Sequence, residues 1–246
     1  MTKPFIHLRT HSSYSLSESN LKIKDLVSHA KKNKMPALAI TDNNNMFGVF
    51  EFAQECINNN IQPIIGSSIT LLDFNHNSTY PQITFLVKNE VGYKNLLYLS
   101  SISHIDQNNE VGIYLKQLDN FTEGLYCYIG GEFNPVLVLE KQNRTTLIEE
   151  FIIELKSKFK KNLLFEIQRI KNEIIDDYEN KFIQLSLKHG IPLIASNNVK
   201  FGESSDSLAH DALLCIAQKT TVNSSERVFS NENIFFKSSK QMEELF

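Results

Sequence analysis

The sequence lacks the features that mark secreted, membrane-bound and zinc-ribbon proteins. Its three cysteines are odd in number and widely spaced, and the absence of a Cys-x-x-Cys pair argues against a disulfide framework or a zinc ribbon. No apolar run approaches the roughly 20 residues that a membrane helix needs. His7 and Arg9 interrupt the region where a signal peptide would have its apolar core. We therefore expect a cytoplasmic protein with no membrane partner.

The chain also lacks an excess of positive charge. It has 25 Lys and Arg against 28 Asp and Glu, a net charge of −3. Binding to a phosphate backbone needs clustered cations, and binding to single strands typically adds interleaved aromatic residues, a pattern that does not occur here. The composition therefore argues against extensive contact with DNA by this domain alone.

What the sequence does contain is a repeating order of strand and helix. Amphipathic patterns predict helices over 21–34, 47–60, 144–160 and 174–189, and Gly190 stands where a helix C-terminal glycine is favoured. Residues 74–80 and 104–112 are predicted as exposed loops. Seven short apolar runs, typical of buried parallel strands, lie at 5–8, 37–41, 63–70, 83–87, 125–129, 163–167 and 192–196. With 246 residues, this order favours a barrel or a doubly wound parallel sheet, and periodicity does not separate the two.

In such folds the functional groups gather at the carboxyl ends of the strands. Arg9 and His11 follow the first predicted strand, with Glu18 a little later, and Asp42 and Asn43 follow the second. The remaining strand ends contribute Ser67, Ser68, Gly130, Gly131, Gln168, Arg169, Asn197, Asn198 and Lys200. This predicts a polar opening at the carboxyl ends of the strands, lined mainly by amides, hydroxyls and cations, which we call the mouth.

A hydrolytic metal centre at this mouth would need several converging His, Asp, Glu or Cys ligands. The competent donors are His11, Glu18 and Asp42, with His104 as a further candidate. Two unit charges about 5 Å apart interact by roughly 3 kcal/mol at an effective dielectric near 20, so nearby cations would repel a divalent ion by about twice that. We therefore expect no tight metal binding.

A different arrangement suits the cations at the mouth. Arg9 and Lys200 could pair with Asp42 and Glu18, so that side-chain cations take the place of metal ions and tie the strands together.

Several segments, in this order along the chain, carry a family resemblance. They are His7 to Leu16, Ala39 to Asp42 with Asn45 to Gly48, Pro63 to Gly66, Leu86 to Glu90 with Gly92 to Leu96, Phe165 to Arg169, Ile191 to Asn197 and His210 to Ile216. Together they resemble the PHP (polymerase and histidinol phosphatase) domain at the N-terminus of bacterial DNA polymerase III alpha subunits. The resemblance implies a distorted seven-stranded (β/α) barrel, with residues 1–246 forming a single PHP domain that is a fragment of a longer polymerase chain.

The departures from that family concern its metal ligands. Metal-retaining relatives would have His at the positions of Arg9, Asn43 and Lys200, an acid at those of Ser68 and Asn198, and Cys near Gly131. His11 is retained and Glu18 stands in an acidic slot. The resemblance therefore implies a vestigial site with no catalytic residue and no metal, made of Arg9, His11, Glu18, Asp42, Asn43, Ser68, Gly131, Asn198 and Lys200.

The resemblance also implies a function for the longer chain. That chain would be a DNA-directed DNA polymerase (a nucleotidyltransferase) acting in DNA replication, with magnesium in its polymerase domain and no cofactor in this one. Its partners would be the remainder of the alpha chain, the proofreading exonuclease subunit, other replicase subunits and, through the full-length chain, DNA. This domain would be structural and would dock the exonuclease.

Two alternatives stay open. One is a metal-dependent phosphoesterase or 3′–5′ exonuclease with a reduced metal site that uses His11, Glu18, Asp42 and His104. The other is a binding module in which Arg9 and Lys200 capture a phosphate or a nucleic-acid end.

Overall fold

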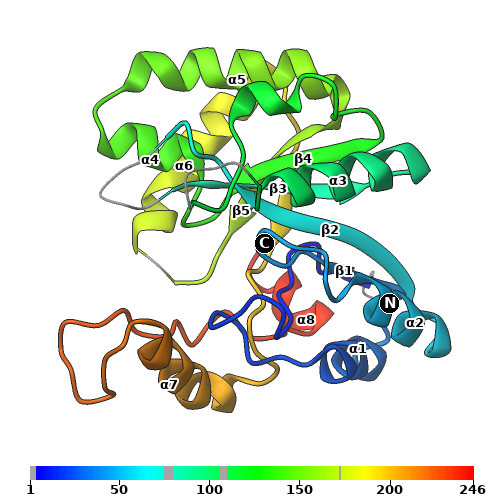
Figure 1. Cartoon of the computed structure of the whole chain (residues 1–246). Coiled ribbons are helices and arrows are strands. Elements are labelled where there is room, and N and C mark those ends of the chain that lie inside the picture. The colour runs from blue at the N-terminus through cyan, green and yellow to red at the C-terminus, as the bar shows by residue number, and fades with distance from the viewer. Residues whose placement is uncertain (1–3, 75–79, 106–109, 172) are drawn as a thin grey trace.

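The computed structural model describes residues 4–74, 80–105, 110–171 and 173–246, with the side chains of 173–177 left aside. One six-stranded sheet runs through the molecule in the order β1-β2-β3-β4-β5-β6 (Figure 1). The strands are β1 Ala37–Ile40, β2 Gln62–Thr70, β3 Gln82–Val87, β4 Leu125–Gly130, β5 Leu163–Gln168 and β6 Leu193–Ser196. The sheet curls, and helices cover its outside. The expected α/β class is therefore confirmed.

The strand directions differ from the parallel arrangement that we expected. β1 and β2 are parallel, as are β4, β5 and β6, but β3 runs antiparallel to both of its neighbours. The reason is the connection between β2 and β3. A parallel crossover needs a dozen or more residues, usually with a helix, and residues 71–81 are too few.

The predicted first strand is not a regular strand, so six described strands replace the expected seven. Its backbone nevertheless bridges the two ends of the curled sheet. The amide of Ala39 donates to the carbonyl of His7 at 3.0 Å on the β1 side, and the amide of His11 donates to the carbonyl of Val199 at 2.9 Å beyond β6. Thr10 interrupts the ladder because its amide bonds to the hydroxyl of Thr41 in place of a backbone carbonyl.

The helices agree with the amphipathic patterns and add elements that those patterns missed. α1 Ile23–Lys32, α2 Val49–Asn58, α5 Thr145–Phe159 and α6 Glu173–His189 confirm the four predicted helices, and Gly190 has the positive φ of +61° expected after α6. The additional α-helices are α3 Glu90–Ile102, α4 Pro135–Lys141, α7 Ser207–Ala217 and α8 Ser239–Glu243, and the 3-10 turns are η1 Leu115–Leu118, η2 Lys160–Asn162 and η3 Ser204–Asp206. Within the predicted loops at 74–80 and 104–112, residues 75–79 and 106–109 lie outside the described residues.

Two apolar clusters hold these layers together. The larger lies between strands β2 to β5 and helices α3 to α6, and the smaller lies between β1 and helices α1 and α2. The inside of the curl contains Tyr128, whose hydroxyl donates to the carbonyl of Leu8 at 2.7 Å. This bond holds the first segment against the sheet. Within the described part of the chain, no helix is both long enough and apolar enough to cross a membrane.

Candidate functional site

A cleft of about 490 Å³ opens where the parallel strands end. Most of the predicted site residues line it: Arg9, His11, Glu18, Asn43, Gly131, Asn198 and Lys200. Asp42 and Ser68 are the exceptions. The hydroxyl of Ser68 bonds to Thr84 at 2.9 Å, between two neighbouring strands. The rule that functional groups gather at strand ends therefore located this cleft from the sequence.

Arg9 forms a buried ion pair with a residue that the sequence analysis did not single out. Its Nε donates to Oε1 of Glu166 at 2.9 Å, and its Nη2 lies 2.8 Å from Oε2. The guanidinium also sits over the ring of Tyr128, 5.4 Å from its centre. Burial would lower the pKa of Arg9, but Glu166 and Tyr128 outweigh burial and raise it. The expected pairing of Arg9 with Asp42 or Glu18 was therefore wrong.

Glu166 has a second partner in the hydroxyl of Ser196, at the end of β6. The carboxylate thus joins three chain segments: the first segment through Arg9, β5 through its own backbone, and β6 through Ser196. The signal that could have identified it is a single carboxylate within the apolar run of β5. A buried carboxylate needs a cation or several donors, and Arg9 was available at the neighbouring strand end.

Lys200 pairs with Glu18, as the sequence analysis expected. Its Nζ lies 3.1 Å from Oε2 of Glu18, and the side-chain amide of Asn43 donates to the same oxygen. The backbone carbonyl of Glu18 accepts a bond of 2.8 Å from Nε2 of His210. Because Nε2 is the donor of the neutral ring, Nδ1 accepts from the hydroxyl of Ser230 at 2.7 Å. Glu18 is therefore fixed on both its side chain and its backbone.

Asp42 is held by hydroxyls and an amide, with no cation among these donors. The amide and hydroxyl of Ser12 and the hydroxyl of Ser15 each donate to its carboxylate at 2.6 Å. Burial raises the pKa of Asp42, and these hydrogen bonds oppose the rise. Both carboxylate oxygens are therefore already engaged inside the protein.

The two candidate histidine ligands lie apart. Burial, followed by the charges of Lys200 and Arg9, lowers the pKa of His11 well below its ordinary value, so its ring is neutral. Its Nδ1 lies 3.4 Å from the hydroxyl of Ser15. His104 does not line the cleft, and its Nε2 donates to the backbone carbonyl of Asn44 at 2.6 Å.

These donors do not fit a multinuclear metal site. Glu18, Asp42 and Glu166 already have hydrogen-bond or ion-pair partners, and Arg9 and Lys200 place two positive charges beside His11. Among residues 4–74, 80–105, 110–171 and 173–246, no three His, Cys, Asp or Glu side chains gather in a group that could hold an ion.

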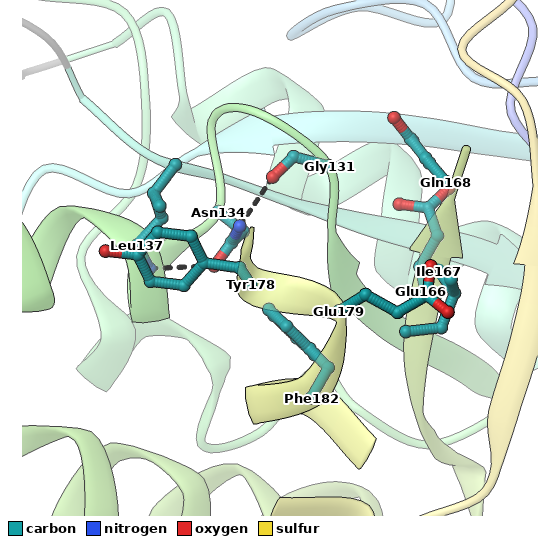
Figure 2. Close-up of a pocket in the computed structure, with 9 residues that line it drawn as sticks. All are labelled: Gly131, Asn134, Leu137, Glu166, Ile167, Gln168, Tyr178, Glu179 and Phe182. Atoms are coloured by element: carbon teal, nitrogen blue, oxygen red, sulfur yellow. Dashed lines mark hydrogen bonds between the residues drawn. The ribbon is translucent and has the colours of Figure 1, made fainter. Parts of the chain in front are cut away.

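Gly131, one of the predicted site residues, has a backbone suited to glycine. Its φ is +72°, and a Cβ there would meet the side-chain amide of Gln168 at 2.9 Å. Asn134 closes this turn by donating to the Gly131 carbonyl and accepting from the amide of Leu137 at 2.9 Å (Figure 2). Gln168 is a buried residue that lines the cleft, and neither polar atom of its side-chain amide has a hydrogen-bond partner among the described residues.

Comparisons with known proteins identify the family of this chain. A sequence model of the PHP domain matches residues 7–170. The chain belongs to the PHP domain family. It is 37% identical to the DNA polymerase III subunit alpha of Rickettsia prowazekii and 34% identical to that of Borreliella burgdorferi. The matches span 100% and 98% of this chain but only 21% and 22% of the two subunits. The chain thus spans about a fifth of the length of these curated relatives.

Two solved structures share the fold of this chain at low identity. An amidohydrolase from Chromobacterium violaceum, solved with bound sulfate and no metal, has a TM-score of 0.52 at 13% identity, over 79% of this chain and 87% of that one. A predicted metal-dependent phosphoesterase from Bifidobacterium adolescentis has a TM-score of 0.51 at 9% identity, over 94% and 96%. At these identities, the likeness extends to the fold alone.

Proposed function

We propose that this chain is the N-terminal PHP domain of a replicative DNA polymerase III alpha subunit and that the domain itself is catalytically silent. Its relatives along the whole sequence are such subunits. DNA-directed DNA synthesis, with magnesium, would then belong to the remainder of the longer chain. The role of this domain is to stabilise that chain and to dock the proofreading exonuclease subunit.

The observation that carries the proposal is the ion pair between Arg9 and Glu166. A guanidinium lies at a position where the family resemblance implies a histidine in metal-retaining members, and it is bound through two nitrogens to a buried carboxylate. Such a pair has the charge and the directionality to hold neighbouring strands together, as a metal ion would. Lys200 and Glu18 form a second pair of this kind, and the charges of Arg9 and Lys200 both act on His11.

The first segment of the chain, residues 7–11, supports a barrel in which this segment is not a regular strand. Residues 7–11 bond to β1 on one side and to Val199 on the other. We propose that this segment takes the role of the seventh strand of the PHP barrel, with Arg9 locking it to β5.

Activity assays test catalytic silence. The 246-residue chain is incubated with zinc or manganese and with a generic phosphate monoester or DNA carrying a free 3′ end. We expect the same background hydrolysis for the wild type and for His11→Ala. Turnover that the His11→Ala substitution abolishes would instead support the phosphoesterase alternative, which uses His11, Glu18, Asp42 and His104.

Assembly assays test the remainder of the proposal. The longer chain should extend a primed template with magnesium, and the 246-residue chain should co-elute with the proofreading exonuclease subunit of the same organism. Failure of the longer chain to synthesise DNA would contradict the polymerase assignment. The anion-binding alternative is weaker, because the carboxylates of Glu18 and Glu166 already neutralise the two cations that it would use.

A further inference from the structure

The side-chain amide of Gln168 is buried beside the cleft without a partner. Gln168 keeps 2% of its accessible surface, and neither its Nε2 nor its Oε1 forms a hydrogen bond with any described residue. Nearly all buried polar atoms in folded proteins are paired, because an unpaired one lowers stability. A donor and an acceptor that are left unpaired side by side therefore indicate a bound group with the complementary pair of atoms.

The backbone at Gly131 leaves room beside this amide. A Cβ at Gly131 would lie 2.9 Å from Nε2 and 3.0 Å from Oε1 of Gln168, so any other residue would crowd both polar atoms. Gly131 and Gln168 both line the cleft. Figure 2 shows the Gln168 side chain extending from the end of β5, away from Tyr178 and Phe182. The glycine therefore keeps the donor and the acceptor uncovered.

Asn43 adds another unpaired acceptor to the same cleft. Its Nδ2 donates to Oε2 of Glu18, which fixes the orientation of its amide, and its Oδ1 is buried without a partner among the described residues. Asn43 and Gln168 together offer two carbonyl oxygens and one amino group. They suit a ligand that carries an amino group next to an acceptor.

The charged side chains that line the cleft cancel one another. Arg9 and Lys200 are positive, Glu18 and Glu132 are negative, and both cations already have a carboxylate partner. A phosphate or carboxylate would thus meet no unpaired cation among the described residues of the lining. The cleft therefore favours an uncharged ligand.

Two exposed aromatic rings also line the cleft. Phe133 and Phe229 keep 45% and 58% of their accessible surface. The guanidinium of Arg227 lies 4.0 Å from the centre of the Phe229 ring, and Asp211 accepts from Nη1 of Arg227 at 2.6 Å. This chain of contacts holds the Phe229 ring in place. Exposed aromatic rings of this kind bind flat heterocycles by stacking.

A nucleobase combines these requirements. A glutamine amide pairs with adenine through the exocyclic amine and the neighbouring ring nitrogen. The cleft, at about 490 Å³, has the size of a small-molecule site. We propose that it binds an uncharged nucleobase with an exocyclic amine, such as adenine, with Gln168 on the edge of the base and Phe229 against its ring. This proposal goes beyond the proposed function and does not depend on it.

Calorimetric titration of the 246-residue chain with adenosine tests the site. Purine riboside, which has the same ring without the amine, is the matched ligand. We expect adenosine to bind about tenfold more tightly, because without the amine the carbonyl of Gln168 stays unpaired. Gln168→Met should remove this difference, and Phe229→Ala should weaken both ligands alike. Gln62→Met, at an exposed glutamine where β2 begins, is the control and should leave the difference unchanged.

Three results would overturn the proposal. The first is that the wild type binds neither nucleoside, and the second is that it binds both equally. The third is that adenosine 5′-monophosphate binds tenfold more tightly than adenosine, which would favour capture of an anion by Arg9 and Lys200. If Gln168→Met failed to fold, the wild-type comparison of adenosine with purine riboside would still decide.

Discussion

Two cation–carboxylate pairs, each with its cation lining the cleft, differ in burial. Arg9 and Glu166 are both buried and joined by two contacts, whereas Lys200 meets Glu18 through one contact and the Glu18 side chain is 41% exposed. Exposed pairs are screened by water, while a buried pair leaves an uncompensated charge if either partner is lost. The two cation–carboxylate pairs therefore have different consequences. One pair holds the strands together, and the other shapes the charge of the cleft.

Breaking the buried pair is expected to give the largest effect. Arg9→Ala should lower the free energy of unfolding by about 3–5 kcal/mol, because Glu166 would stay buried with only Ser196 as a donor. Urea denaturation of the wild type and the variant measures the loss.

The matched control replaces both partners. Arg9→Leu with Glu166→Leu should recover most of the stability, since an apolar pair of similar volume leaves no buried charge. If Arg9→Ala cost less than Lys200→Ala, the assigned difference between the two pairs would be wrong.

Lys237 is a third cation, and it extends the comparison to a buried cation without a carboxylate partner. Its partners are a side-chain amide and a backbone carbonyl, and no carboxylate of the described residues pairs with it. Its Nζ donates to the side chain of Asn197 at 3.2 Å and to the carbonyl of Asn233. Burial, with a smaller contribution from Lys171, lowers the pKa of Lys237 to about 8.

The sign of the pH effect follows from that shift. Between pH 8 and the ordinary pKa of 10.5, the unfolded chain holds a proton that the native state has released, so this group makes stability rise with pH. The rise amounts to about 3 kcal/mol. Lys237→Met should therefore stabilise the protein at pH 7 and remove this alkaline rise.

Urea denaturation at pH 7 and pH 10 gives the free energy of unfolding of wild type and variant at each pH. Lys240→Met, at an exposed lysine three residues away, is the control and should change neither value. An unchanged pH dependence in Lys237→Met would show that Lys237 keeps its proton when buried.

Breaking the exposed pair should give the smallest effect. Lys200→Ala is expected to lower the free energy of unfolding by no more than about 1 kcal/mol. The loss should shrink further at high salt, because Glu18 stays solvated and keeps Asn43 as a donor. A loss as large as that of Arg9→Ala, measured in the same urea series, would contradict the account.

Much of the site could be predicted because strand ends converge in parallel α/β folds. Arg9, His11 and Lys200 were placed at one mouth from the apolar runs alone, and the pair of Lys200 with Glu18 followed from their opposite charges. The partner of Arg9 could not be found in the same way. Glu166 lies inside β5, and only the curl of the sheet brings it to Arg9.

The fold was predicted in class and in most of its elements, but not in strand direction or closure. Apolar runs report burial and say little about which way a strand runs, so β3 was assumed to be parallel. The segment at 5–8 is apolar and bonds to the sheet, yet the hydroxyl of Thr41 interrupts its ladder at Thr10. Such a side-chain bond depends on tertiary contact, which periodicity does not contain.

The most direct test of the central claim is the metal content of the protein. The 246-residue chain is equilibrated with zinc or manganese, separated from free ions and subjected to elemental analysis. If Arg9 and Lys200 occupy the place of the metals, the protein should retain only substoichiometric amounts of either ion. Retention of a stoichiometric ion that the His11→Ala substitution abolishes would contradict this account.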